Sequence, residues 1–224
     1  MQKWIQNSRA GCEIRMEELL TRIEELKKDN KIKILVEKRL MEFSEMRKKE
    51  STDIFKELCF CILTANFNAE KSIKIQEKIG DGFLNLSESQ LAERLKELGH
   101  RYPNTRARYI VLARKYKDSL KMIINSFKEE IKLRDWLVKN IKGIGYKEAS
   151  HFLRNIGYFN FAILDFHIID CLVNYRLIDK PKILTKRNYL EIEKLLKDVA
   201  KKAGINLAQL DLYLWYFETG KILK

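Results

Sequence analysis

A lysine placed directly after a glycine turn is the first feature of this sequence that could perform chemistry. The turn spans residues 141–146 and contains Gly143 and Gly145, and Lys147 follows it. Glycines give a turn the φ freedom and the lack of bulk that let backbone N–H groups approach an anion such as a phosphate. A deprotonated lysine amine is a nucleophile that forms an imine with carbonyl-like carbon. The combination indicates a DNA-bound amine nucleophile, with Lys142 in the turn as a candidate phosphate contact.

A carboxylate, Asp165, follows eighteen residues after Lys147. Each of these two residues also has an ordinary structural interpretation. A lysine after a glycine turn is usually a surface charge, and an aspartate before an apolar run is usually a helix N-cap. Taken singly, the two residues leave a catalytic and a structural interpretation open.

Two short helices must hold the glycine turn if it is to present Lys147. Side chains recur at the spacing of one helix face on both sides of the turn, which predicts a helix, a tight hairpin and a second helix. The upstream face comprises Leu133, Trp136, Leu137 and Asn140, and the downstream face comprises Ala149, Phe152, Leu153 and Ile156.

Helical patterns also fill most of the remaining chain. Apolar stripes at helical spacing lie within 16–26, 54–65 and 192–200, and each is expected to face a core. Ser87 and Gln90 have the spacing of a capping box, and Gly157, Gly204 and Gly220 stand where helices should end. The alternating segment 159–163 is short and predicts an extended connector rather than a sheet. We therefore expect an all-α fold.

The helices are expected to form two lobes with a DNA-binding cleft between them. The central lobe would span 50–157 and contain the hairpin, and the second lobe would combine 1–49 with 158–224. The sequence has two prolines and no Gly/Ser tract, so no linker or internal repeat divides it. We expect one module over 1–224.

The composition is compatible with a nucleic-acid partner. Lysine and arginine number 44 against 31 acidic residues, which gives a net charge of +13 and a pI near 9.5. A basic face that contacts phosphates is a reasonable expectation at this charge. A charged fraction of 33% would equally suit a solvated, heat-adapted surface. Charge alone therefore does not decide between these interpretations.

The four cysteines argue against a metal site. Cys12, Cys59, Cys61 and Cys171 lack zinc-finger or iron–sulfur spacing, so we expect buried, reduced thiols and no metal or organic cofactor. The N-terminal residues 1–6 have no signal-like apolar region, and no apolar run reaches the ~18 residues that a membrane span requires. We expect a cytoplasmic protein that associates with the nucleoid through DNA.

Three segments of the sequence together resemble a known family. The segment 135–170 contains Gly143-Ile-Gly-Tyr-Lys147 and then Leu-Asp165-Phe-His167, and it is accompanied by ILTANFNAEKS at 62–72 and LWYFETGKILK at 214–224. These motifs resemble the helix-hairpin-helix, Gly/Pro-loop, Asp superfamily of DNA glycosylases. Within it, they are most similar to the archaeal and thermophile-type 8-oxoguanine DNA glycosylase/AP lyases. The similarity covers most of 52–224.

The resemblance implies a bifunctional DNA repair enzyme. Lys147 would attack C1′ of the damaged nucleotide, and the resulting Schiff base would permit β-elimination at the abasic site. Asp165 would stabilise positive charge developing on the sugar and assist proton transfer, and His167 would contact a phosphate near the lesion. The partner would be duplex DNA that contains an oxidised guanine or an abasic site, bound by a monomer.

The resemblance also implies how the damaged base is recognised. 8-Oxoguanine carries a hydrogen on N7 where guanine has a lone pair, so an acceptor at N7 favours the lesion. Lys224 would supply this acceptor from its main-chain carboxylate, while Trp215 and Tyr102 would stack on the base. The alternative is that Trp215 is peripheral core and the tail frays. Tyr102 stands where relatives often have phenylalanine.

Extruding a base leaves a hole in the duplex, which side chains must fill. Asn66 and Asn68 follow an apolar helix and could meet the orphaned cytosine, although a simple turn explains small polar residues equally well. Further candidate phosphate contacts are Arg101, Arg106 and Arg108, which could instead be solvated.

Three other interpretations remain open at the level of sequence. A non-catalytic helix-hairpin-helix module would need the glycine turn and the basic surface but not Asp165. A glycosylase for another oxidised base would share the hairpin and the lysine but differ in its pocket. A helical scaffold protein would explain the apolar stripes and leave the motif accidental.

Overall fold

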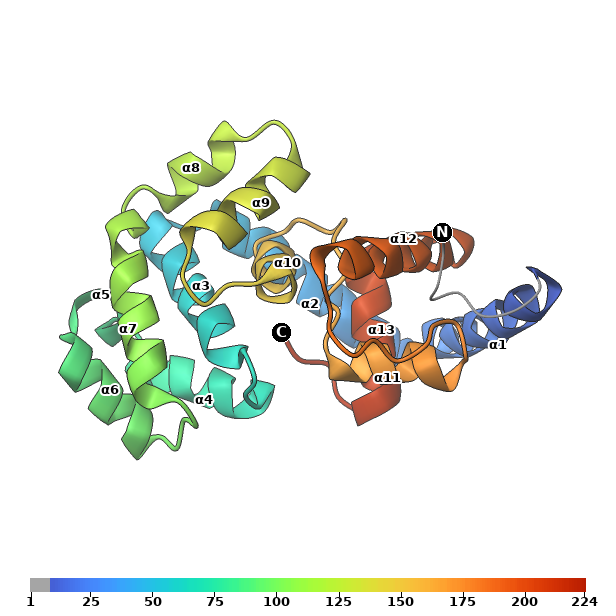
Figure 1. Cartoon of the computed structure of the whole chain (residues 1–224), viewed down its shortest axis with the longest axis horizontal. Helices are drawn as coiled ribbons and strands as arrows, with labels where there is room; N and C mark the ends of the chain where they lie inside the picture. Colours follow the sequence, from blue (N-terminus) through green and yellow to red (C-terminus); the bar gives the residue numbers. More distant parts are fainter. Residues whose placement is uncertain (1–8) are drawn as a thin grey trace. The chain divides into compact units, whose positions relative to one another are not determined.

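The computed structural model describes residues 9–224, with side chains from residue 13 onward (Figure 1). These residues form thirteen α-helices and one short 3-10 helix, and no strand occurs among them. The segment 159–163 contains neither helix nor strand. The expected all-α fold is therefore confirmed, and 159–163 forms a connector rather than a sheet, as predicted. The prediction that residues 1–6 lack a signal-like apolar region lies outside the described residues. The predicted burial of Cys12 concerns a side chain that the structure does not describe.

The described residues divide into two compact units. Unit 1 contains the described residues through Glu42 together with Phe159–Ile222, and unit 2 contains Phe43–Tyr158 together with Leu223–Lys224. Helix α2 (Asn30–Lys48) runs through the boundary between them. The last two residues thus pack with a different unit from the rest of the C-terminal segment.

Unit 2 is organised around helix α3 (Ser51–Thr64), whose residues 54–64 are nearly all buried. Its neighbours pack on several sides because α3 is apolar around most of its circumference (Figure 1). The hairpin consists of α9 (Glu130–Asn140) and α10 (Tyr146–Asn155), and α10 packs directly on α3. The remaining elements are α4 (Ala69–Ile79), α5 (Gly82–Asn85), α6 (Glu88–Glu97), α7 (Pro103–Ala113), η1 (Arg114–Tyr116) and α8 (Leu120–Ser126).

Unit 1 is organised around helix α13 (Leu207–Thr219), which contacts three other helices. These are α1 (Arg9–Lys28), α11 (Phe166–Asn174) and α12 (Lys186–Lys202). The stripe predicted in α12 is buried at Ile192, Leu196 and Val199. Figure 1 shows α13 between α11 and α12.

The helix boundaries follow the local signals in the sequence. The predicted capping box is present at α6, where the Ser87 hydroxyl accepts from the Gln90 N–H and the Gln90 side chain accepts from the Ser87 N–H. Gly157, Gly204 and Gly220 all have positive φ and follow helix ends, as expected. These terminators set the lengths of α10, α12 and α13.

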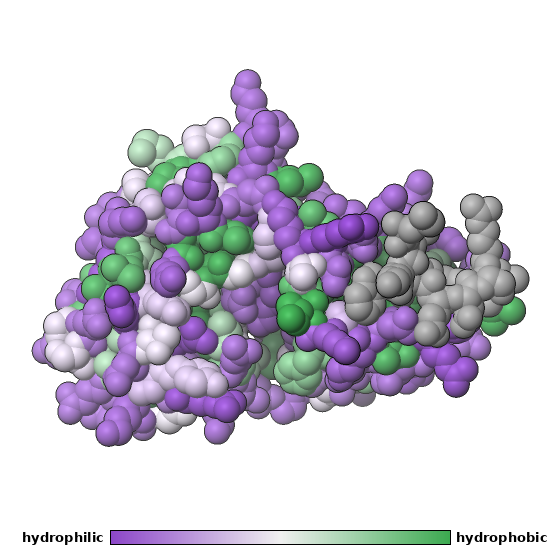
Figure 2. Space-filling model, in the orientation of Figure 1, coloured by the Kyte–Doolittle hydropathy of each residue, from purple (hydrophilic) through white to green (hydrophobic). Residues whose placement is uncertain are grey.

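The surface is mainly hydrophilic and the described thiols are buried, as the composition and the cysteine spacing predicted. Hydrophilic residues cover most of the face drawn in Figure 2, and hydrophobic residues form small separate patches there. Cys59, Cys61 and Cys171 are free and buried, as predicted. Within the described residues, no helix is both long enough and apolar enough to cross a membrane.

Candidate active site

The hairpin turn of unit 2 requires glycine at one position for two reasons. Gly143 has φ +86°, in the region that L side chains disfavour. A Cβ built on Gly143 would lie 2.3 Å from Cδ2 of Tyr109 in α7, so the ring of Tyr109 occupies the space of a side chain. Gly145 is different, because its φ of −97° is open to any residue. The predicted need for φ freedom is therefore confirmed at Gly143 and wrong at Gly145.

Lys147 is the second residue of α10, one position later than the sequence indicated, because the helix begins at Tyr146. Its Nζ lies 3.5 Å from Oε1 of Glu148, and 23% of the Lys147 side chain is exposed. The other carboxylate oxygen of Glu148 accepts the Gly145 N–H at 3.1 Å. Glu148 therefore both closes the turn and contacts the Lys147 amine. The sequence analysis missed this residue, although a glutamate at the third helical position is a capping signal.

Buried polar contacts fix α9 against α10. Arg134 is 1% exposed, and its Nη1 donates to the Ser150 hydroxyl at 3.2 Å. The Arg134 guanidinium lies 5.2 Å from the ring centre of Tyr146, and the Tyr146 hydroxyl donates to Asp135. A buried guanidinium that lost these polar and aromatic partners would be costly to leave in place, so the contacts stabilise the packing of α9 on α10.

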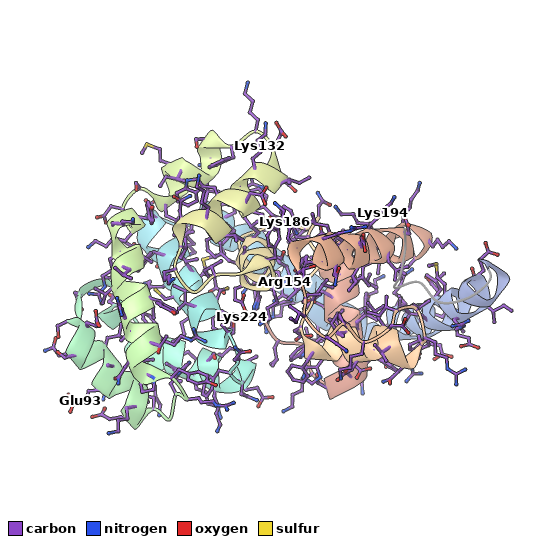
Figure 3. All side chains as sticks on the ribbon, in the orientation of Figure 1. Glu93, Lys132, Arg154, Lys186, Lys194 and Lys224 are labelled. Atoms are coloured by element: carbon purple, nitrogen blue, oxygen red, sulfur yellow. The ribbon has the colours of Figure 1, made fainter. Side chains whose placement is uncertain are left out.

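Lys224 lies in unit 2, beside α3, α4 and α10. Its Nζ donates to Oε2 of Glu57 at 2.8 Å and to the Gln76 side-chain oxygen, and it lies 4.4 Å from the ring centre of Phe60. The tail is therefore anchored, and the alternative of a frayed tail is wrong for this residue. Lys224 and the neighbouring Arg154 of α10 are labelled in Figure 3.

His151 lies one helical turn after Lys147 on the same face of α10. Burial lowers the pKa of His151 well below its usual range, and the positive charges of Arg154, Lys147 and Lys224 act in the same direction. Burial and these charges therefore both favour the neutral imidazole. It hydrogen-bonds the main chain of Lys224, while Nδ1 is buried with no partner among the described residues. The sequence analysis missed His151, as it missed Glu57 and Gln76.

Asp165, His167 and Trp215 lie together in unit 1. The Asp165 carboxylate accepts the Ile168 N–H at 2.9 Å and caps α11, so the structural interpretation of Asp165 is correct. The His167 ring meets the Trp215 ring edge to face, with centres 4.6 Å apart. Phe166 is 67% exposed and its ring lies 3.9 Å from that of His167. Trp215 is partly exposed, and its Nε1 has no partner among the described residues.

The two asparagines of unit 2 have different environments. The Asn68 side chain accepts the Lys71 N–H at 2.9 Å and caps α4, as a simple turn would require. Asn66 is exposed and has φ +56°, an uncommon conformation for a residue other than glycine. The Arg106 guanidinium braces this loop by donating to the Ala65 carbonyl.

The remaining candidate DNA-contacting residues of unit 2 differ in how exposed they are. Arg106 is 7% exposed, and this burial lowers its pKa, so its prediction as a phosphate contact is wrong. Lys142, Arg101 and Arg108 are exposed. Tyr102 is 36% exposed at the start of α7, and its N–H donates to Nδ1 of the buried His100.

Comparisons with known proteins agree with this geometry. The family model described as Ogg-HhH, 8-oxoguanine DNA glycosylase, matches residues 36–205. An 8-oxoguanine DNA glycosylase/AP lyase of Korarchaeum cryptofilum is 54% identical, with 88% of this chain and 94% of that protein covered. The corresponding protein of Methanocaldococcus jannaschii is also 54% identical, with 92% and 99% covered.

Solved structures extend the similarity to the fold. The crystal structure of the M. jannaschii 8-oxoguanine DNA glycosylase has a TM-score of 0.90 at 52% identity, covering 95% of this chain and 99% of that chain. The complex of that enzyme with DNA containing 8-oxoguanine gives 0.90 at 53% identity, covering 92% and 100%. The Thermotoga maritima enzyme gives 0.88 at 44% identity, covering 93% and 100%. The chain therefore belongs to the 8-oxoguanine DNA glycosylase family.

Proposed function

We propose that this chain forms one glycosylase module over 1–224 that excises 8-oxoguanine from duplex DNA and then cleaves the strand at the abasic site. The observation that carries the proposal is the amine of Lys147, which a glycine turn and Glu148 hold at the start of a fixed helix. Family membership supports the same chemistry. The substrate is duplex DNA with an oxidised guanine or an abasic site.

The proposed reaction has two stages. The lone pair of the Lys147 amine attacks C1′, the bond from C1′ to the base nitrogen breaks, and the base leaves with the bonding electrons and a proton. After the sugar ring opens, the enzyme is joined to C1′ as an imine. The imine acidifies the C2′ proton, and its removal expels the 3′ phosphate by β-elimination. Asp165 provides a negative charge that stabilises the developing cation and assists proton transfer.

We assign recognition of the base to Lys224, Trp215 and Tyr102. A main-chain oxygen of Lys224 accepts the N7 hydrogen that distinguishes 8-oxoguanine from guanine. Trp215 and Tyr102 offer aromatic surface for stacking, and the partial exposure of both rings supports this assignment.

We assign contacts with the DNA backbone to four residues. Gly143 and Gly145 give the turn the lack of bulk that lets a phosphate approach its backbone, although the Gly145 N–H itself donates to Glu148. Lys142 adds a positive charge, and His167 contacts a phosphate near the lesion. Of the two asparagines, we favour Asn66 for the orphaned cytosine, because the Asn68 side chain is already engaged as a helix cap. We further propose a monomer that acts on nucleoid DNA in the cytoplasm without metal or organic cofactor.

Borohydride trapping tests the proposed function. The protein is incubated with duplexes that carry 8-oxoguanine, thymine glycol, uracil or an abasic site, with and without borohydride. We expect a covalent protein–DNA adduct and strand cleavage on the 8-oxoguanine and abasic duplexes. Lys147→Gln should abolish both products, whereas Lys139→Gln, which removes an exposed lysine of α9, should retain them.

Three outcomes would contradict the proposal. Normal trapping by Lys147→Gln would identify another nucleophile. DNA binding with neither adduct nor cleavage would identify a non-catalytic hairpin module. Preferential cleavage of the thymine glycol duplex would move the substrate to oxidised pyrimidines.

A further inference from the structure

We propose that Glu57 and Gln76 are positioning residues that seat the ammonium group of Lys224 and thereby place its main chain beside α10. The inference rests on the proposed function, because it assigns the accuracy of base recognition to a buried polar socket. In this arrangement the side chain of Lys224 is an anchor, and its main chain is the part that meets the base.

The socket is formed mainly by α3 and α4. Glu57 is 2% exposed, and one of its carboxylate oxygens lies 2.8 Å from Nζ of Lys224. Gln76 accepts from the same ammonium and donates to the same carboxylate oxygen at 3.2 Å. The ring of Phe60 forms a third wall, 4.4 Å from Nζ. The ammonium therefore has a charge, an amide oxygen and an aromatic face as partners.

The carboxylate of Glu57 is held in place from its other side. Asn155 of α10 donates to the second oxygen of Glu57 at 2.7 Å. The side-chain oxygen of Asn155 in turn accepts from Nε and Nη2 of Arg154 at 3.0 and 2.9 Å. Because these contacts come from α10, the helix that carries Lys147 also orients the carboxylate that receives Lys224. The socket and the nucleophile thus share one rigid element.

Seating the ammonium fixes the main chain of Lys224. The side chain of Lys224 is only 21% exposed, so its ammonium is committed to the socket rather than free for DNA phosphates. The main chain of the same residue is hydrogen-bonded by His151, one turn from Lys147. Loss of the contacts of the ammonium group would therefore allow the main chain of Lys224 to move. A displacement of about 1 Å in a catalytic arrangement can cost about 100-fold in rate.

Lys224→Met tests the anchor while retaining the main chain. Single-turnover excision of 8-oxoguanine should fall by about 10- to 100-fold at saturating enzyme. The enzyme concentration at half-saturation should stay within about twofold, and β-elimination at a preformed abasic site should stay close to wild type. Lys221→Met, which removes an exposed lysine from the same tail, is the matched control and should excise normally.

Glu57→Gln tests the socket from the opposite side. This variant leaves the buried ammonium without its counter-charge and should show the same selective loss of excision. If both residues act through one contact, Glu57→Gln combined with Lys224→Met should be no slower than the slower single variant. Independent, multiplying losses would overturn the shared role.

The outcomes separate the inference from the proposed function. If wild type does not release 8-oxoguanine, the proposed function fails. If wild type excises and Lys224→Met matches Lys221→Met, the anchor is wrong while the enzyme assignment stands. Equal losses on the lesion and the abasic duplex would also overturn the anchor, because a general structural defect affects both. If Glu57→Gln does not fold, the comparison of Lys224→Met with Lys221→Met still decides.

Discussion

In unit 2 the two candidate amines, of Lys147 and Lys224, are held by glutamate side chains. In unit 1 the candidates are an aspartate that caps its own helix and two aromatic rings that pack together. Lys147 and Lys224 are fixed in unit 2 by Glu148 and Glu57, the second pair being 167 residues apart in sequence. In unit 1, the Asp165 carboxylate accepts a backbone N–H three residues away, and the ring of Trp215 meets the ring of His167.

Function and stability are coupled to different degrees in the two units. A charge that is buried among partners cannot be removed without leaving one of them uncompensated, so changes in unit 2 should affect both activity and folding. A local helix cap can be replaced by another capping residue at little cost. Changes in unit 1 should therefore separate chemistry from stability more cleanly than changes in unit 2.

The largest expected effect is at Asp165. Asparagine caps helices about as well as aspartate but carries no charge. Asp165→Asn should therefore leave the melting temperature nearly unchanged and slow base excision by about 100- to 1,000-fold, a typical cost of losing one electrostatic contribution to a transition state. Single-turnover excision and thermal unfolding measure the two effects.

Asp165→Ala is the companion variant. It removes the cap as well as the charge, and should add a loss of about 1 kcal/mol in the free energy of unfolding. If Asp165→Asn excises as fast as wild type, the carboxylate of Asp165 is only a helix cap and unit 1 loses its catalytic role.

The second prediction concerns the hairpin of unit 2. Gly143→Ala forces a side chain into a positive-φ position at a cost of about 1–2 kcal/mol and against the ring of Tyr109 at about 1–3 kcal/mol more. Denaturant unfolding should show the summed loss, and the affinity for DNA should fall with it.

Gly204→Ala in unit 1 is the matched control. Gly204 also has positive φ, +66°, but a Cβ there would meet nothing within 4 Å. Its loss should be limited to about 1–2 kcal/mol from the backbone alone. Equal losses in the free energy of unfolding at the two glycines would show that the Tyr109 ring moves aside. The hairpin would then be less tightly packed than the structure indicates.

The smallest expected effect is at Trp215. Stacking of a base on an aromatic ring is worth about 1–3 kcal/mol, so Trp215→Ala should slow excision of 8-oxoguanine by about 5- to 150-fold. Cleavage at a preformed abasic site, which presents no base to stack, should change little. The ratio of the two rates is the measurement.

Trp136→Ala supplies the comparison in unit 2. Trp136 packs against Tyr116 and Phe127, with ring centres 5.2 and 6.2 Å away. Its loss should lower the free energy of unfolding without changing the ratio of excision to abasic-site cleavage. A selective loss of excision at Trp136, or its absence at Trp215, would contradict the assignment of stacking to unit 1.

Local features of the fold were predictable because they depend on residues close in sequence. The capping box at Ser87 and Gln90, the glycine terminators and the helices around the turn 141–146 all follow from interactions within a few residues. Asp165 was predicted as both catalyst and cap, and the cap is confirmed while its catalytic role stays a prediction. Errors arose where a tertiary contact decided, as at Arg106, whose guanidinium is buried against a loop carbonyl.

The all-α fold, the hairpin with its lysine and the family could be read from the sequence, because periodicity, turn chemistry and short motifs act over short stretches of chain. The packing of Tyr109 on Gly143, the burial of His151 and the pairing of Glu57 with Lys224 are visible only in the folded molecule. These depend on which helices meet, and an isolated glutamate in an apolar helix gives no sign of its partner 167 residues away. The structure alone identifies the partner of that carboxylate.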